Sequence, residues 1–177
     1  MRKKRCKAFL LSAFTLVLLL SVTACAGKAP KTIDTYASAK SDLYASAAEL
    51  EAAAQLVVRA EKTEQEENVA VPLSAQGAYH GYMLSEVSVK EMLTDSAGRN
   101  VQPGDGLQIL ENQFTYAEQD GTQATCHINR YVKMQPGKEY YLFLRYSEEN
   151  GYYVILSGFL GKVPVDESEP VLFRRRS

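Results

Sequence analysis

Cys126 and His127 are neighbours in the sequence, and a cysteine beside a histidine is the pair that thiol-based nucleophilic catalysis requires. Adjacent residues of a strand point to opposite faces, so direct adjacency is poor geometry for a catalytic couple. No local signature of a cysteine peptidase surrounds the pair. The pattern favours a half-buried or exposed small residue in a loop. An enzyme that uses Cys126 as its nucleophile remains the alternative hypothesis.

Other ligand-binding residue types are scattered. His80, His127 and Cys126 lack the close spacing of zinc ligands, so we expect no metal site. The segment QPGDG at residues 102–106 lacks both the Gly-Lys-Ser/Thr ending of a phosphate-binding loop and the closing glutamate of an EF-hand. It predicts a tight turn in which glycine takes a positive φ. We therefore expect no cofactor and no catalytic or cofactor-binding residue.

Tyrosine is unusually frequent in this chain, with 11 residues. Exposed tyrosines could form a platform for a sugar or a peptide, but tyrosine is also a common half-buried strand residue. The pattern favours the structural role. Five of the tyrosines gather in two β-rich runs: Tyr140, Tyr141, Tyr146, Tyr152 and Tyr153.

The N-terminal segment has the organisation of a secretory signal. Five basic residues, the last of them Lys7, precede an apolar run of 15 residues from Ala8 to Val22. A membrane-spanning helix needs about 20 apolar residues, so a permanent span is the weaker interpretation. We expect residues 1–24 to direct export and to be removed.

The end of this run, Val22-Thr23-Ala24-Cys25, resembles the lipobox of bacterial lipoproteins. The resemblance implies cleavage before Cys25 and lipidation of its thiol, with acyl chains such as palmitate as a stable anchor. It also implies a location at the bacterial cell membrane, facing the outside of the cytoplasm. The other interpretations are an ordinary cleaved signal peptide and an uncleaved anchor.

Removal of the signal changes the charge and cysteine content. The remaining chain has 15 basic and 21 acidic residues, a net charge of −6. No broad basic stripe is left, which argues against nucleic-acid binding. Cys6 leaves with the signal and Cys25 would be acylated, so only Cys126 stays free. The fold must therefore depend on its core and not on disulfides.

The pattern of the mature chain predicts a tether followed by one β-rich domain. Residues 25–40 are small and polar and predict a lipidated tether, and residues 41–177 predict the domain. Ser46 and Glu49 match a capping box within a short helix at residues 41–54. Residues 64–77 and 112–130 are polar and predict loops, the second being the segment most open to functional use. Predicted strands occupy the other segments: residues 55–63, 79–93, 107–112, 139–146, 152–161 and 170–177.

Turn signals recur between the strands, and Asn150-Gly151 predicts a hairpin. The expected fold is mainly β: a small antiparallel barrel or sandwich with one short N-terminal helix. Residues 41–165 also resemble small uncharacterised lipoproteins and secreted proteins of Gram-positive bacteria. The resemblance is carried by Leu56-Val57-Val58, residues 87–93, Pro103-Gly104-Asp105-Gly106, and residues 137–144 and 151–161, and the sequence departs from it at residues 113–123. A similar strand order occurs in netrin-type and metalloproteinase-inhibitor domains, which implies an OB-like barrel and no function.

These observations lead to one expectation about function with two alternatives. We expect a membrane-anchored lipoprotein without enzymatic activity that binds a protein, a peptide or an envelope component. The alternatives are a cell-envelope enzyme that uses Cys126 and a structural or assembly lipoprotein. The identity of the ligand is not encoded in any motif of the sequence.

Overall fold

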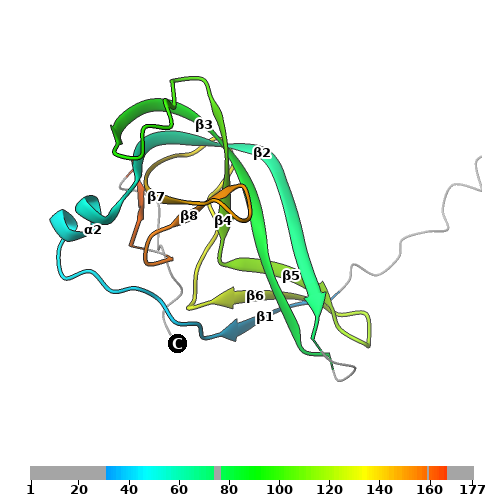
Figure 1. Ribbon diagram of the computed structural model, residues 1–177. Helices are drawn as coiled ribbons and strands as arrows, with labels where there is room; N and C mark the ends of the chain where they lie inside the picture. Colours follow the sequence, from blue (N-terminus) through cyan, green and yellow to red (C-terminus); the bar gives the residue numbers. More distant parts are fainter. Residues whose placement is uncertain (1–30, 74–76, 159, 167–177) are drawn as a thin grey trace, which may run out of the picture. The chain divides into compact units, whose positions relative to one another are not determined.

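The computed structural model describes residues 31–73, 77–158 and 160–166. Strands dominate this part of the chain, and one short helix precedes most of them (Figure 1). The predicted mainly β fold class is thereby confirmed. The elements, in chain order, are β1 (Thr32–Ala37), α2 (Ala47–Ala53), β2 (Leu56–Pro72), β3 (Tyr79–Asp95), β4 (Gly106–Glu111), β5 (Gln113–Ala117), β6 (Gln123–Ile128), β7 (Glu139–Ser147), β8 (Tyr152–Ile155) and β9 (Lys162–Pro164).

The helix α2 is shorter than the predicted helix at residues 41–54, and it begins at Ala47, directly after the Ser46 N-cap. The Ser46 side chain accepts a hydrogen bond from the Glu49 backbone N–H at 3.2 Å, and the Glu49 carboxylate accepts one from the Ala45 N–H at 2.6 Å. The first bond satisfies an N–H group that the first turn of a helix leaves without a partner, and the second holds the residue that precedes the cap. Leu50 is the buried residue of this helix and packs with Ala54, Val57 and Leu156.

Five strands pair in a ring. The ladder runs from β2 to β3, β4, β8 and β7, and β7 pairs with β2 to close the sequence of pairings. All of these pairs are antiparallel except β4 with β8, and β9 adds a further antiparallel pairing with β7. This barrel-like ring of five strands is the architecture that the OB-like resemblance implies. Its interior holds the main core, built from β2, β3, β4, β7 and β8 together with Val101, Tyr131 and Met134.

The strand β3 shows how the sequence pattern directs the core. Met83, Val87 and Val89 alternate on one face and are buried. The same alternation would place Leu93 on this face, but Leu93 is 46 % exposed. The register explains the difference: Val57 pairs with Thr94 and Val58 with Met92, so Leu93 is an extra residue of a β-bulge.

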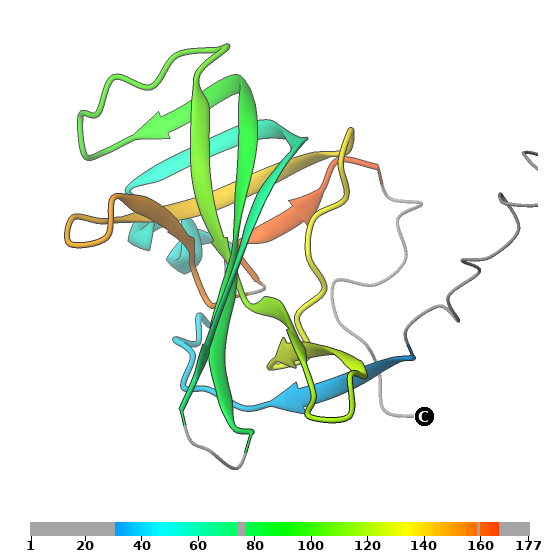
Figure 2. The same ribbon diagram turned by 90° about the vertical axis from the view of Figure 1, so that its right-hand side faces the viewer.

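A second, three-stranded sheet has the order β1-β6-β5. Its β5 follows β4 after the single residue Asn112, and its β1 lies parallel to β6 (Figure 2). The predicted loop at residues 112–130 is therefore wrong, because it contains β5 and β6. The predicted tether is also too long at its C-terminal side, because residues 32–37 form β1. Most side chains of these segments are polar, so the sequence shows little of the apolar alternation that marks a strand, although backbone pairing forms the three strands.

The predicted loop at residues 64–77 is wrong for a related reason. β2 continues through this segment to Pro72 and pairs with β3 as a long two-stranded ribbon beyond the barrel. Residues 64–68 of this ribbon are all exposed, so its charged residues give no strand-like alternation. The hairpin at Asn150-Gly151 is confirmed, and Gly151 has φ 77°. The predicted strand at residues 152–161 ends at Ile155, because Ser157 and Gly158 adopt positive φ angles.

The signal segment, Cys25 and the predicted last strand at residues 170–177 lie outside the described residues. Within the described ranges, no helix combines the length and the apolar character that crossing a bilayer requires.

Candidate functional site

Cys126 lies inside β6 and not in a loop, so that expectation is wrong. The residue is 7 % exposed and occupies the register position opposite Thr35 of β1. Burial raises the pKa of the Cys126 thiol, and a hydrogen bond with the Thr35 side chain opposes this rise. A buried thiol with a raised pKa forms less of the reactive thiolate.

His127 is occupied by partners other than Cys126. Its Nδ1 lies 2.7 Å from the Tyr131 carbonyl oxygen, and its Nε2 lies 3.2 Å from Asp34 Oδ1. The Tyr36 ring stacks on the imidazole with 5.5 Å between centroids. These contacts fasten β1 to β6, so His127 has a structural role and is not free to act as a base for Cys126.

The remaining residues singled out from the sequence have structural positions as well. His80 lies in β3 opposite Val71. The turn predicted at residues 102–106 is confirmed, with Gly104 at φ 97° and the Asp105 carboxylate accepting the Gln102 N–H at 2.8 Å. Among the described residues, no group of three or more His, Cys, Asp or Glu side chains could hold a metal ion.

The tyrosines of the β7–β8 hairpin divide between core and surface. Tyr140 and Tyr153 are buried, whereas Tyr141, Tyr146 and Tyr152 are half-buried. Tyr146 packs edge-on against Tyr153, and the Arg99 guanidinium lies 3.5 Å from the Tyr146 ring centroid. This arrangement supports the structural role that the sequence pattern favours.

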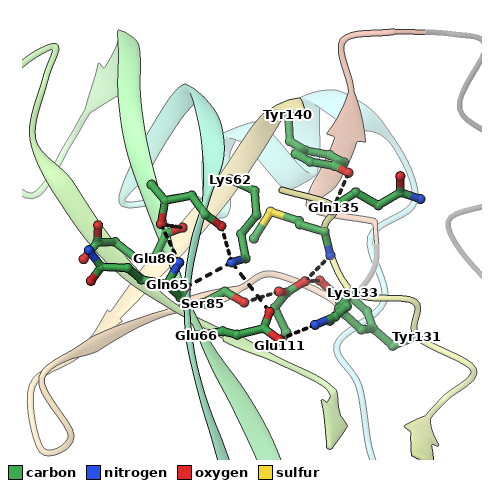
Figure 3. A network of polar contacts seen from close by, with 12 residues as sticks. Lys62, Gln65, Glu66, Ser85, Glu86, Glu111, Tyr131, Lys133, Gln135 and Tyr140 are labelled. Carbon is green, nitrogen blue, oxygen red and sulfur yellow. Dashed lines mark hydrogen bonds and ion pairs between the residues drawn. The ribbon is translucent and has the colours of Figure 1, made fainter. Parts of the chain in front are cut away.

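A buried polar network that sequence reasoning missed surrounds Glu111 at the end of β4 (Figure 3). The fully buried Glu111 carboxylate accepts hydrogen bonds from Ser85 Oγ at 2.5 Å, Tyr131 OH at 2.7 Å and the Met134 N–H at 2.6 Å. A buried carboxylate needs such donors because it has lost its hydration. Burial, together with the adjacent Glu111 carboxylate, raises the pKa of Tyr131 well above its usual value.

Two buried lysines complete this region. Lys62 Nζ donates to the carbonyl oxygens of Thr63 at 2.7 Å and Gln65 at 3.0 Å. Lys162 Nζ donates to the Val132 carbonyl and lies 4.0 Å from the Tyr131 ring centroid. The charged groups of this network are buried away from solvent. Their hydrogen bonds, together with backbone bonds between Lys62 and residues 137–138, hold the segment of residues 131–138 against the barrel interior.

The signal for two of these residues was present in the sequence. Lys62 continues the inward series Val58 and Ala60, and Glu111 continues the inward series Leu107 and Ile109. Period two places both charges on the core face of their strands. Charged side chains are rarely buried, so the alternation alone does not predict that these two residues are buried. No comparable pattern marks Lys162.

A groove of about 390 Å³ opens on the surface of the described part of the chain. Its lining comes from the segment after β1, from the β4–β5 and β6 ends, and from β7, β8 and the turn that follows β8. We call this the β8-turn groove and define it by residues 39–42, Asn112, Asn129, Arg145 and residues 154–158. It combines the apolar Val154–Leu156 segment with amide and charged side chains, a mixture typical of small-ligand sites.

Ser157 is the most unusual residue of the groove. Its φ is 60°, a left-handed conformation that residues other than glycine seldom adopt. Ser157 Oγ is buried and has no hydrogen-bond partner within the described part of the chain, while the Ser157 carbonyl accepts a bond from Ser41 Oγ at 2.6 Å. Such strain and such an unsatisfied hydroxyl occur preferentially at functional sites.

The rim of the β8-turn groove carries a positive and a negative side chain. Arg145 Nη2 lies 3.8 Å from Asp42 Oδ2, and both side chains are more than half exposed. An exposed pair at this distance contributes little to folding, so both groups can exchange partners with a ligand. The Asn129 side chain already has two partners within the protein. Its Oδ1 accepts a hydrogen bond from the Ala39 N–H at 3.0 Å, and its Nδ2 donates one to the Ala39 carbonyl at 2.9 Å.

Comparison with protein-family models, curated proteins and solved structures gives no match to this chain.

Proposed function

We propose that this protein is a bacterial lipoprotein, held by acylated Cys25 at the cell membrane and facing the outside of the cytoplasm. The observation that carries the proposal is the coincidence of three sequence features. They are a basic start, an apolar run of 15 residues and the sequence Val22-Thr23-Ala24-Cys25 at its end. Acyl chains on Cys25 would anchor the exported chain stably.

The exported part would act as a binding module and not as an enzyme. Cys126 is buried with a raised pKa, and His127 has its own partners, which removes the support for a thiol nucleophile. The β8-turn groove offers a cation, a carboxylate and amide groups beside an apolar floor. This lining suits a peptide or an envelope component that presents polar groups of both signs.

Lipidation is tested by substitution of the attachment residue. We expect Cys25→Ser, or treatment with globomycin, to leave an unprocessed precursor of higher mass, and Cys25→Ser to abolish the incorporation of labelled palmitate into the chain. Cys6→Ser is the matched control, because it changes a cysteine of the same signal segment and should leave processing and labelling intact. Normal processing and palmitate labelling of Cys25→Ser would refute the anchor.

Binding is tested with defined envelope fragments. We expect soluble muropeptides or short peptides to shift the NMR signals of groove residues, and Arg145→Glu to abolish these shifts. Lys90→Glu serves as the control, because Lys90 is a partly exposed cation outside the groove lining. Equal binding by both variants, or shifts confined to other surfaces, would exclude the groove as the ligand site.

A further inference from the structure

The outer end of the β2–β3 ribbon exposes large apolar side chains. Val71 is 51 % exposed and Leu73 is 66 % exposed, and the Leu73 N–H bonds the Ala78 carbonyl at 2.7 Å across the ribbon. The sequence from Val69 to Tyr79 contains no charged residue, although Glu66 and Glu67 come directly before it with Asn68. An exposed apolar group in an otherwise polar ribbon indicates a contact surface.

This end of the ribbon belongs to the same side of the domain as the point where the chain enters it. Tyr79 OH donates to the Ala117 carbonyl at 3.3 Å, and the Tyr79 and Tyr116 rings stack with 4.4 Å between centroids. Ala117 pairs with Gln123, and Gln123 pairs with Thr32 at the start of β1. In Figure 2 the ribbon end and the start of β1 both lie in the lower half of the view, the ribbon end at its left and the start of β1 at its right.

The chain between the anchor residue and the domain is short. The first described residue, Lys31, is bound to β6 through its carbonyl, which accepts the Gln123 N–H at 2.9 Å. Lys31 follows Cys25 by six positions, and an extended chain of that length spans about 20 Å at most. An acylated Cys25 therefore keeps the start of β1 within about 20 Å of the lipid.

We propose that Val71 and Leu73 contact the phospholipid bilayer that holds the acylated Cys25. This inference rests on the proposed lipid anchor, and its partner is the lipid surface itself. Leucine and valine side chains leave water favourably at such an interface. Glu66 and Glu67 lie further back along the ribbon, where they stay hydrated, so the contact is shallow and confined to the ribbon end.

The charge of the neighbouring turn supports a shallow contact. Glu118 and Asp120 belong to the β5–β6 connection, next to Ala117, and carboxylates do not enter hydrocarbon. Asp120 has a lowered pKa, mainly through hydrogen bonds with Thr122, and remains charged. The membrane side of the domain would thus pair one apolar insertion with a hydrated acidic turn.

The absence of tryptophan from the sequence allows a direct test. Leu73→Trp and Leu93→Trp each place a single tryptophan at an exposed leucine site, one at the ribbon end and one near the other end of β3. The full acylated chains are reconstituted in vesicles of phosphatidylethanolamine and phosphatidylglycerol with brominated acyl chains. We expect the Leu73→Trp variant to show a blue-shifted indole emission that bromine quenches severalfold more than the emission of Leu93→Trp.

The outcomes separate this inference from the proposed function. Acylated, vesicle-bound Leu73→Trp protein with unshifted and unquenched emission overturns the membrane contact and leaves the anchor intact. A chain whose mass shows no acyl group refutes the anchor instead. Blue-shifted emission without bromine quenching, together with crosslinking between two copies, would assign the ribbon end to self-association and would also overturn the inference. Equal urea midpoints of the two variants verify that both are folded.

Discussion

Glu111 is a buried carboxylate whose three donors are spread along the chain: Ser85 of β3, Tyr131 and Met134. The last two belong to the segment between β6 and β7. A polar cluster of this kind specifies where that segment lies against the barrel. Its stability depends on every donor keeping an acceptor, because an unsatisfied buried donor loses its solvation without compensation.

Substitution of this residue should therefore be severe. We expect Glu111→Ala to lower the free energy of unfolding by about 3–5 kcal/mol, since it leaves buried donors unpaired and opens a cavity. Glu111→Gln should cost less, because one side-chain oxygen remains as an acceptor. Urea denaturation measures both, with exposed Glu64→Ala as a control expected within about 0.5 kcal/mol of the parent protein. A Glu111→Ala loss as small as the control would contradict the network.

The buried Tyr131 hydroxyl makes the stability of the folded protein depend on alkaline pH. Its pKa is raised in the folded state, so the folded protein retains a proton that the unfolded chain releases near the usual tyrosine pKa of about 10. The stabilisation is fully present below about pH 10 and is lost as the pH rises towards the folded-state pKa. Urea midpoints should fall above pH 10, and less steeply in Tyr131→Phe. A parent protein in which every tyrosine ionises at 295 nm with its circular dichroism unchanged would refute this.

For single residues, the sequence predicts burial where an alternation repeats along a strand. It does not predict a residue's position where that position depends on contacts between distant segments. Period two placed Lys62 and Glu111 on core faces, and only the general rarity of buried charge argued against them. The left-handed backbone of Ser157 has no such signal, because Leu156-Ser157-Gly158 is compatible with a continuing strand. The groove therefore could not be located before its segments were brought together.

At the scale of elements, Gly81 of β3 lets the three-stranded sheet approach the ribbon. A Cβ atom at this position would meet the Val69 carbonyl oxygen and would lie 2.6 Å from the Phe114 ring of β5. The carbonyl belongs to the paired strand and cannot move without disturbing the ladder. Glycine is thus required here by close approach and not by backbone angle.

This contact predicts a large effect of one methyl group. Gly81→Ala should reduce the free energy of unfolding by about 1–3 kcal/mol, because the added carbon overpacks the junction. Gly106→Ala is the matched control, since its nearest atom would be 3.7 Å away in the Glu86 side chain. Comparable urea midpoints for the two variants would show that the junction relaxes freely.

The pairing of β1 with β6 predicts protection of Cys126. In a chain whose other two cysteines are replaced by serine, we expect the folded protein to react with Ellman's reagent far more slowly than the urea-unfolded protein. The thiol is buried under this pairing, and its raised pKa reduces the thiolate fraction. Thr35→Pro in β1 should accelerate the reaction by weakening the pairing. Equal rates for folded and unfolded protein would place Cys126 at the surface.

The elements that the sequence predicted correctly have a local cause. The helix has its capping box, the β7–β8 hairpin has Asn150-Gly151, and β3 has its alternation. The elements that it missed are polar segments: β1 pairs with the distant β6, and the outer half of β2 pairs with the strand that follows it, β3. Backbone hydrogen bonds override their weak strand propensity, and the side-chain pattern does not record these bonds.

On the scale of the whole domain, the point where the chain enters the domain and the β8-turn groove lie at opposite ends of β1. Lys31 adjoins the first residue of β1, and the groove begins at Ala39, just beyond its last residue. Six strand residues span about 20 Å, so the groove would stand clear of the lipid surface. A ligand could then enter the groove while the ribbon end contacts the membrane.

The short connection to Cys25 is central to this arrangement. We expect a flexible Gly-Ser insertion between Cys25 and Lys31 to preserve membrane anchoring and to reduce the bromine quenching of the Leu73→Trp variant. The longer linker lowers the effective concentration of the ribbon end at the lipid surface. Flotation with the vesicles controls for anchoring, and undiminished quenching at every linker length would show that the tether does not govern the contact.

The parallel pairing of β1 with β6 also has a mechanical consequence. A pull on Lys31 along the direction of β1 loads the ladder from Thr32–Gln123 to Ala37–Ile128 in shear, so its hydrogen bonds resist together. A pull across the strand would unzip them one at a time. Residues 32–37, which were predicted as part of a tether, would therefore resist a pull along β1 as a fastened strand of the domain.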